Sequence, residues 1–502
     1  MSPLWRDAVS LVVKMLLFCA VVHATTLYHT ITVRTPPDVP TVPFPPSTSP
    51  VPTAPLADVL QDMNWTACPS RRDDPTDGHF RLWDEMLAQS LRRSAQGFPK
   101  MRKESWHAVT EHIHVYSAFL VTTTERAIHI ISLVRNNELN GTAVEHPPLV
   151  CIVQTSNATI TRNASIRLVW TFFEPSFQNA FVMCPSPQAT FSDDEDVQVA
   201  IVATGYSDSS LRWLRLHRPP KKSKKKCCAV CVRPLFGALS LWKIVEFVAH
   251  YRFLGARSFY FYDLNMTLDA RLLFARMQSL RVDVTFVSFK LIVNATIDHA
   301  QVQAHGQVPA LYDCIFRSLS KMEYYVHVDI DELMVPPRNL SVPKLVRKME
   351  RKHKRRLGSL MIPTRYHCAE YPLNYRYASR EYLPLQTRVF IYHPARQLHD
   401  TSMRKYIARS RTVCQAGVHS VQRHCGRRAK SFCLRGYAVI RHYKRCCIYK
   451  AGSRNDKFAS LYNVTRVSPD RTFAYFSARI EEDMVVRALR SLIDQSENNI
   501  LT

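Results

Sequence analysis

One segment constrains the fold more than any other, the stretch from Tyr324 to Glu332. Its alternating apolar residues predict a buried strand. Because successive side chains of a strand point to opposite faces, Asp329 and Asp331 share one side where the strand ends. Two carboxylates placed in this way form an oxygen site suited to Mn²⁺ or Mg²⁺, and a cation held there can balance the charge of a diphosphate. An isolated Asp-x-Asp pair is also typical of a solvated turn, so the neighbouring segments decide between the two.

Strand and helix patterns alternate from residue 227 onward, which predicts an α/β domain with a mostly parallel central sheet covered by helices. In such sheets ligands gather at the carboxyl ends of the strands, where Asp263, Asp329 and Asp331 all fall. The predicted strands are Cys228–Val232, Ser258–Tyr262 and Val282–Phe289, and the predicted helices are Leu239–Phe253, Ala270–Leu280 and Val308–Leu319.

The chain divides by composition into six parts. Residues 1–30 predict a signal anchor or a cleaved signal peptide, because an apolar stretch is followed by small residues at Val22 to Ala24. Residues 31–60 form a Pro/Thr-rich stem that cannot pack a core. Residues 61–217 carry short alternating apolar runs typical of a β-rich accessory domain, and residues 218–226 form a basic linker. The α/β domain covers residues 227–480, and residues 481–502 form a C-terminal helix or tail.

Sequons and cysteines indicate an oxidising, lumenal environment. Setting aside Cys19 in the leader leaves thirteen of the fourteen cysteines, an odd number, so we expect disulfides and one thiol that is free or pairs between chains. A zinc site around Cys228 and Cys231, or around Cys446 and Cys447, is the lesser alternative. Eight Asn-x-Ser/Thr sequons begin at Asn64, Asn140, Asn157, Asn163, Asn265, Asn294, Asn339 and Asn463.

The formal net charge of +26 invites a nucleic-acid interpretation, which the sequence does not support. The densest basic run, Lys221 to Lys226, lies in the linker. There is no zinc-finger spacing, and the basic runs lack the interleaved aromatic residues of a single-strand binder. The charge therefore favours anionic substrates or membrane surfaces as partners.

A series of motifs lies between residues 227 and 450. The motifs, in chain order, are Cys231–Leu235, Glu246–Tyr251, Leu254–Gly255, Phe259–Asp263, Gly306–Gln307, Tyr312–Arg317, Val328–Leu333, Lys405–Ile407, Gly417–Ser420 and His442–Tyr443. As a set they resemble glycosyltransferase family 92. The resemblance implies a GT-A nucleotide-sugar fold and an inverting, metal-dependent β-galactosyltransferase that uses UDP-galactose, with Mn²⁺ or Mg²⁺ as cofactor. The acceptor would be an N-glycan or another glycoprotein glycan.

The resemblance also implies donor-binding roles for particular residues. Asp329 and Asp331 are expected to hold the metal, and a late histidine completes the site: His419 is preferred over His442. Three further residues are expected to bind the nucleotide or its diphosphate: Arg233, Asp263 and Lys405. The alternatives are an N-cap role for Asp263 and plain surface positions for Arg233 and Lys405.

The catalytic base is the least determined role. Inversion requires a carboxylate that takes the proton of the acceptor hydroxyl. We favour Glu370, with Glu381 and Asp400 as alternatives. Glu332 could orient Asp331. Gln307 and Asp313 are expected to brace the sheet or the sugar site, or else simply to pack a helix.

The leader, stem and sequons together predict a single-pass type II protein of the Golgi membrane with a lumenal catalytic domain. Cleavage of the leader would give a secreted form. The main alternative from another functional class is an inactive lumenal or cell-surface glycan-binding protein.

Overall fold

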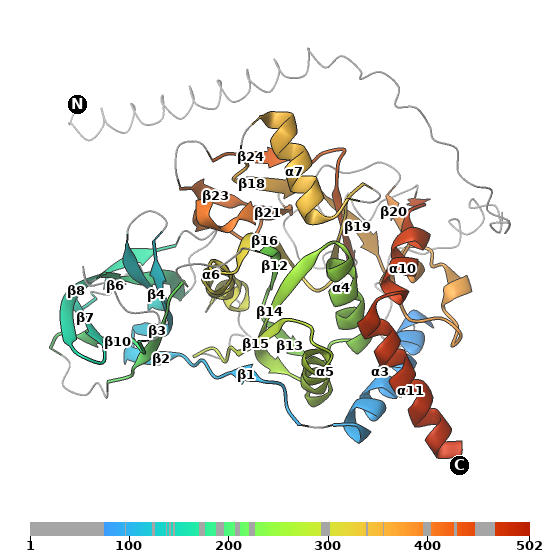
Figure 1. The fold of residues 1–502 in the computed structure, drawn as a ribbon, viewed down its shortest axis with the longest axis horizontal. Helices are drawn as coiled ribbons and strands as arrows, with labels where there is room; N and C mark the ends of the chain where they lie inside the picture. Colours follow the sequence, from blue (N-terminus) through green and yellow to red (C-terminus); the bar gives the residue numbers. More distant parts are fainter. Residues whose placement is uncertain are drawn as a thin grey trace. The chain divides into compact units, whose positions relative to one another are not determined.

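The computed structural model describes sixteen stretches of the chain, and element labels follow Figure 1. Among the helices within these stretches, none combines the length and apolar character needed to cross a bilayer. The predicted leader (1–30) and stem (31–60) lie outside the described residues. The described residues are 75–95, 97–122, 126–136, 138–139, 142–143, 146–169, 176–186, 195–205, 211–219, 226–292, 302–337, 340–354, 356–394, 403–425, 429–446 and 467–501.

A nine-stranded sheet carries the candidate site. Its order is β1-β15-β14-β12-β16-β21-β18-β24, with β13 paired to β14. The pairs from β1 to β16 are parallel, whereas β21 runs antiparallel to both β16 and β18. The strands are β1 (Met101–Arg102), β12 (Lys226–Val232), β13 (Leu235–Gly237), β14 (Ala256–Met266), β15 (Val284–Ser288), β16 (Met322–Val328), β18 (Ser359–Ile362), β21 (Lys405–Arg409) and β24 (Ser431–Cys433).

Helices alternate with the parallel strands, so the predicted mixed α/β class is confirmed. The Ser240 hydroxyl caps α4 by accepting the Lys243 N–H at 3.3 Å, and α4 ends before Gly255, whose φ of +91° favours glycine. The helices in this region are α4 (Leu241–Phe253), α5 (Leu268–Ser279), α6 (Gln307–Ser318) and α7 (Val342–His353). All six strands and helices predicted between residues 228 and 319 are present, with bounds shifted by a few residues.

Alternation along the central strands divides their side chains between two cores. Val230 of β12, Phe261 of β14 and Val326 of β16 lie in the first core, with the apolar residues of α4, α5 and α7. The residues between them, such as Cys231 and Tyr262, lie in the second core with α6. The sheet is therefore buried on both faces, which explains why its strands are nearly continuous apolar runs.

Residues 107–217 form a second, eight-stranded sheet in the order β11-β10-β7-β8-β9-β4-β3-β2. Because β11 also pairs with β3, seven of these strands close into a barrel with its own apolar core. The strands are β2 (His107–Thr110), β3 (Ile113–Val121), β4 (Ala127–Arg135), β7 (Leu149–Gln154), β8 (Thr159–Leu168), β9 (Phe177–Pro185), β10 (Gln198–Ala203) and β11 (Leu214–His217).

The remaining elements lie outside these two large sheets. Helix α3 packs on α4, α5 and α11, so the start of the predicted accessory region contacts the α/β core instead of the barrel. Their bounds are α3 (Pro75–Arg93), β5 (Glu138–Leu139), β6 (Thr142–Ala143), η2 (Gln303–Gly306), β17 (Glu332–Val335), β19 (Thr364–Cys368), η3 (Tyr375–Tyr377), α8 (Gln386–Val389), β20 (Tyr392–Pro394), η4 (Ser410–Thr412), β22 (Val413–Ala416), β23 (Val421–His424), β25 (Val439–Lys444), β26 (Val467–Pro469), α10 (Phe473–Glu481) and α11 (Met484–Leu501).

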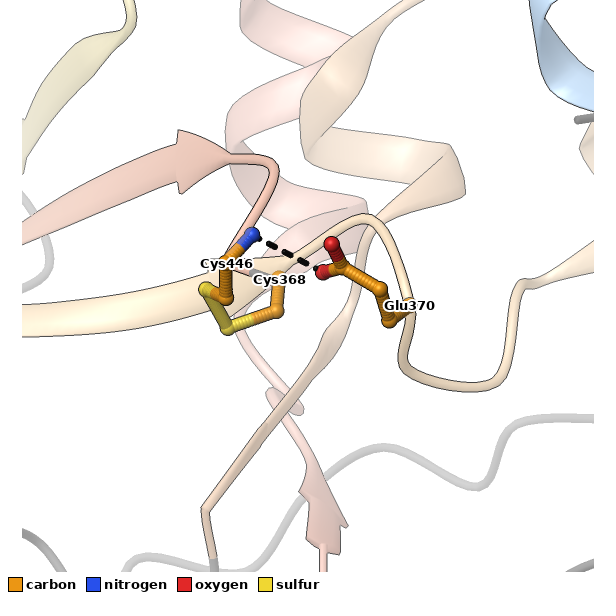
Figure 2. A group of neighbouring side chains, drawn as sticks. All are labelled: Cys368, Glu370 and Cys446. Atoms are coloured by element: carbon orange, nitrogen blue, oxygen red, sulfur yellow. Dashed lines mark hydrogen bonds between the residues drawn. A yellow bond between two sulfur atoms is a disulfide. The ribbon is translucent and has the colours of Figure 1, made fainter. Parts of the chain in front are cut away.

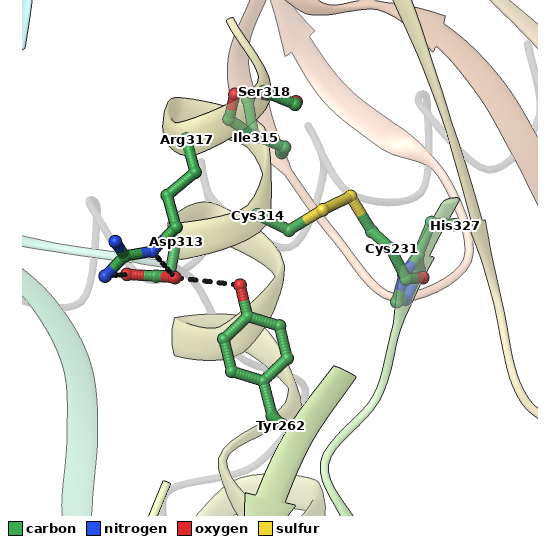
Figure 3. Close-up of a disulfide and its surroundings, with 8 residues drawn as sticks. All are labelled: Cys231, Tyr262, Asp313, Cys314, Ile315, Arg317, Ser318 and His327. Carbon is green, nitrogen blue, oxygen red and sulfur yellow. Dashed lines mark hydrogen bonds and ion pairs between the residues drawn. A yellow bond between two sulfur atoms is a disulfide. The ribbon is translucent and has the colours of Figure 1, made fainter. Parts of the chain in front are cut away.

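Five disulfides join described cysteines, which confirms the prediction that most cysteines are oxidised. Cys228 is bonded to Cys227, and Cys231 to Cys314 of α6, so the C-x-x-C pair cannot form the zinc site considered as an alternative (Figure 3). The other three bonds are Cys151–Cys184, Cys368–Cys446 and Cys414–Cys425. Among the described cysteines, Cys433 is free and exposed.

Helix α6 lies between the barrel and the central sheet (Figure 1), and a buried ion pair fixes it there. Asp313 is fully buried and accepts hydrogen bonds from Arg317, from Tyr262 of β14 at 2.8 Å and from Ser117 of β3 at 2.8 Å. Arg317 also donates to Glu104 at 2.8 Å (Figure 3 shows its pairing with Asp313). One carboxylate therefore joins the barrel, α6 and the sheet, which is the bracing role predicted as one option for Asp313.

Replacing Arg317 with Ala should leave Asp313 buried without its cation and lower stability by about 3–5 kcal/mol. The loss is measured as a lower midpoint of thermal unfolding by circular dichroism. The matched control is Arg92→Ala, which removes an exposed arginine paired with Asp269 and should leave the midpoint nearly unchanged. Equal midpoints for the two variants would contradict the role given to the buried pair.

Candidate functional site

The candidate site forms where β16 ends beside the parallel strand β12. Val328 and Ile330 point into the first core, as the alternation predicts, so Asp329 and Asp331 lie on the other side of the chain. The Asp329 side chain is 13% exposed and the Asp331 side chain 28% exposed, so both are largely buried, and Asp331 reaches solvent more.

Two side chains donate hydrogen bonds to the Asp329 carboxylate. The Lys405 ammonium from β21 lies 3.0 Å from Oδ2, and the Gln307 side-chain amide donates to Oδ1 at 3.2 Å. Lys405 also lies 3.3 Å from Oε2 of Glu332, and that same oxygen accepts the backbone N–H of Asp329 at 2.8 Å. The antiparallel pairing of β21 with β16 places Lys405 at this position.

An imidazole lies beside Asp331. Strand β17 pairs with β25 so that Glu332 and His442 are partners in register. His442 Nε2 is 3.3 Å from Asp331 Oδ2, and its Nδ1 is 3.4 Å from Glu332 Oε1. The backbone carbonyl of Asp331 accepts the Tyr443 N–H at 2.9 Å, which ties the Asp-x-Asp turn to β25.

The local cations keep the paired aspartates ionised. Burial raises the pKa of Asp329, but Lys405 and then Arg233 outweigh it and hold that pKa below its ordinary value. Burial likewise raises the pKa of Asp331, and His442 outweighs it. The pKa of Glu332 is raised, because burial exceeds the effect of Lys405. The site therefore presents two carboxylates that stay charged although little exposed to water.

The donor set fits a divalent cation. Three carboxylates, those of Asp329, Asp331 and Glu332, lie within one turn of chain against the ammonium of Lys405 and the more distant charge of Arg233. Lys405 engages one oxygen of Asp329, and the more exposed Asp331 lies beside the His442 ring. Carboxylate oxygens with an imidazole nitrogen are ligands that Mn²⁺ accepts, and carboxylates suit Mg²⁺.

Gln307 reaches Asp329 because of an unusual entry into α6. Ala304, His305 and Gly306 have φ values of +48°, +53° and +73°, a left-handed turn that precedes the helix. A Cβ at Gly306 would lie 2.9 Å from the Phe289 ring, so this position requires glycine. Gln307 therefore braces the candidate site directly, through its hydrogen bond to Asp329.

The structure places the other predicted donor-site residues around this centre. Arg233, one residue after β12, acts electrostatically on both aspartates. Asp263 lies near the end of β14 and is 5% exposed; it accepts the Met266 N–H at 2.9 Å and pairs with Arg271 at 2.9 Å. His419 Nδ1 lies 3.1 Å from the Arg404 carbonyl oxygen. The imidazole against Asp331 is that of His442, the alternative to His419 in the sequence analysis.

Glu370 lies two residues beyond β19, against the Cys368–Cys446 disulfide (Figure 2). Its Oε2 accepts the Cys446 backbone N–H at 3.0 Å. The two sulfurs and a carboxylate oxygen of these residues lie within 4.8 Å of one another. Because the sulfurs are bonded to each other, they supply no thiolate for a metal, so the zinc alternative involving Cys446 is wrong. Of the other candidate bases, Glu381 is exposed and Asp400 lies outside the described residues.

His327 is a site residue that the sequence analysis missed. It lies two positions before Asp329 on the same side of β16, so the period-2 alternation could have found it. Its ring is 3.2 Å from both the Gln307 amide and the Cys231 carbonyl. Burial, followed by the charge of Lys405, lowers its pKa to about 3, so it is a neutral hydrogen-bonding group.

A family model described as Glycosyltransferase family 92 matches residues 226–484, which contain every described residue of the site. No protein with a curated description matches the chain.

Lys405→Met should destabilise the protein by about 3–5 kcal/mol, because it leaves Asp329 and Glu332 close together and buried without their shared cation. The thermal midpoint measures this loss. Lys344→Met, which changes an exposed lysine of α7, serves as the control and should leave the midpoint unchanged. A Lys405→Met midpoint equal to that of the wild type would show that the ammonium does not hold the tip of the sheet together.

Proposed function

Because this chain belongs to glycosyltransferase family 92, we propose that it is an inverting transferase that moves galactose from UDP-galactose onto a glycan acceptor with β linkage. Family membership indicates a glycosyltransferase, and the proposal adds the donor, the linkage, the acceptor class and the need for Mn²⁺ or Mg²⁺. We further propose that the α/β domain is a GT-A nucleotide-sugar domain.

The observation that carries the proposal is the pair of ionised aspartates at the carboxyl end of β16, beside Arg233 at the end of β12. The carboxyl end of parallel strands is where open α/β sheets bind ligands. The sheet arrangement also supports a GT-A domain, since five neighbouring strands are parallel and helices cover them.

In the proposed site Asp329 and Asp331 hold the cation, with His442 or His419 as the imidazole ligand. The cation, when bound, balances the charge that develops on UDP as it leaves. Lys405 is fixed by Asp329 and Glu332, so it orients Asp329, while its charge lies near the diphosphate.

Two further residues are proposed to contact the donor. Arg233 approaches the diphosphate from the end of β12. Asp263 binds the ribose or uridine. Its carboxylate accepts hydrogen bonds from the Met266 N–H and the Arg271 guanidinium, and its remaining lone pairs can accept hydrogen bonds from the nucleotide as well.

Glu370 is the proposed base. As the acceptor oxygen bonds to C1 of galactose, its proton passes to the Glu370 carboxylate, and the bond between C1 and the diphosphate oxygen breaks with its electron pair leaving on UDP. Attack opposite the leaving group inverts the configuration at C1.

A lumenal location in the Golgi membrane is proposed from the predicted leader, the disulfides and the sequons. Asn157, Asn163 and Asn265, the described sequon asparagines, are all exposed, as glycosylation requires. The partners of this proposal are therefore a UDP-sugar, a glycoprotein glycan and, through the leader, a membrane.

Asp329→Asn and Asp331→Asn should each lower kcat/KM for UDP-galactose by about 100-fold or more, because each change removes a carboxylate that holds the cation, and the cation stabilises the departing UDP. The rate is measured as Mn²⁺-dependent UDP release and as labelled galactose on a glycan array. Asp269→Asn, which changes a carboxylate of α5 paired with Arg92, should retain the wild-type rate. Wild-type protein that shows no turnover with either metal would instead favour the inactive glycan-binding alternative, and transfer of another sugar would overturn the donor assignment.

Glu370→Gln should lower kcat by about 10²–10⁴-fold, because an amide cannot take the acceptor proton. The amide oxygen can still accept the Cys446 N–H, so folding should be preserved and is checked by the thermal midpoint. The variant should also lose the acidic limb of the pH–rate profile. Glu381→Gln is the control and should keep the wild-type kcat. If Glu381→Gln lowers kcat and Glu370→Gln does not, Glu381 is the base instead.

A further inference from the structure

Two cavities lie on either side of Phe316, where the barrel packs against the end of α6. The first has a volume of about 210 Å³ and the second about 320 Å³, and both are lined by Val121 and Phe316. The second volume lies within the range of about 300–1,000 Å³ typical of ligand sites. Neither cavity includes Asp329 or Asp331, so they are separate from the candidate donor site.

Packed aromatic rings lie between the two cavities. The half-buried Phe316 ring lies 5.3 Å from Phe119, which lines the first cavity. On the other side it lies 5.7 Å from His129 and 5.9 Å from both Phe181 and Tyr312, which line the second. Phe119, Phe181 and Tyr312 are buried and hold Phe316 in place, so the half-buried Phe316 ring is the one that can meet the apolar face of a sugar ring while polar groups at the rim bind its substituents.

The rims are strongly basic. Arg102 and Lys321 line the first cavity and Arg423 lines the second, all three are exposed, and neither lining contains a carboxylate among its described residues. Within the described part of the chain, no ion pair involves these three cations. By contrast, Arg317, also at the first cavity, is neutralised by Asp313 and Glu104. Among the described residues, therefore, no carboxylate balances the positive charge of Arg102, Lys321 and Arg423.

Polar groups that can bind sugar hydroxyls lie beside these cations. Gln415 lines the second cavity, and His129 Nδ1 is buried there without a hydrogen-bond partner among the described residues. Burial lowers the pKa of His129 to about 4, so the ring is neutral and can donate or accept a hydrogen bond.

We propose that these two cavities bind an acidic oligosaccharide, one that carries sulfate or uronic-acid carboxylate groups. Arg102 and Lys321 bind anionic groups at one end and Arg423 at the other, with the ring between them near Phe316. Single-strand binders stack successive bases on a series of exposed aromatic rings, whereas here Phe119, Phe181 and Tyr312 are buried and Phe316 is half-buried; concave cavities also do not match a flat membrane surface. The site is independent of the proposed transfer reaction.

The test is direct binding of a fluorescent heparin-derived hexasaccharide to the full-length chain by anisotropy, without UDP-sugar or divalent cation. We expect Arg423→Ala and the double variant Arg102→Ala with Lys321→Ala each to weaken binding about tenfold or more. Arg423→Lys should retain most of the affinity. Neutral maltohexaose should bind at least tenfold more weakly than the heparin hexasaccharide.

The control variant Lys222→Ala with Lys224→Ala removes two charges from the basic linker and should bind as the wild type does. Thermal midpoints verify that each variant is folded. Binding that depends on the linker lysines and not on Arg102, Lys321 and Arg423 would overturn the proposal. So would equal affinity for single-stranded DNA of matched charge with the same losses in the variants, since that pattern describes a general polyanion surface. Because no donor is present, failure here leaves the transferase proposal standing.

Discussion

The buried ammonium of Lys405, shared by Asp329 and Glu332, is the interaction on which the candidate site depends. It joins β21 to the end of β16 and the start of β17. Without this ammonium, the carboxylates of Asp329 and Glu332 would lie close together with no cation between them. Two buried carboxylates at this distance repel each other strongly unless a cation lies between them. With Lys405 in place, the carboxylates of Asp329 and Asp331 stay ionised beside Arg233, and a charged site can exist at the tip of an otherwise apolar sheet.

The second constraint is that the central sheet is covered on both faces. One face packs on α4, α5 and α7, and the other on α6, whose far side meets the barrel. Helix α6 therefore does several things at once: Gln307 at its start touches Asp329, Cys314 is bonded to β12, and Asp313 with Arg317 connects to the barrel. Helix α6 thus links the barrel to the candidate site, and the basic cavities lie at the other end of the same helix.

Much of the α/β region could be predicted from sequence because the signals are local. The period of 2 in β16, the helical spacing in α4 and the glycine at Gly255 each determine the conformation of their own segment. The pairing of β17 with β25 could not be predicted from local patterns, since it depends on contacts between residues 110 positions apart, and this pairing places His442 beside Asp331. The same holds for Lys405, which looked like a surface lysine in a very basic chain and is almost fully buried. Closure of the barrel by β11 and β3, and the packing of α3 on the central core, also come from long-range contacts that periodicity does not contain.

The central claim is that Asp329 and Asp331 bind a divalent cation, which in turn binds UDP. Electron paramagnetic resonance of Mn²⁺ titrated into the full-length chain measures this directly, because free Mn²⁺ gives a strong signal that diminishes on binding. The account predicts that UDP increases the fraction of bound Mn²⁺, and that the double variant Asp329→Asn with Asp331→Asn abolishes this increase. The same UDP-dependent binding in the double variant and the wild type would contradict the account.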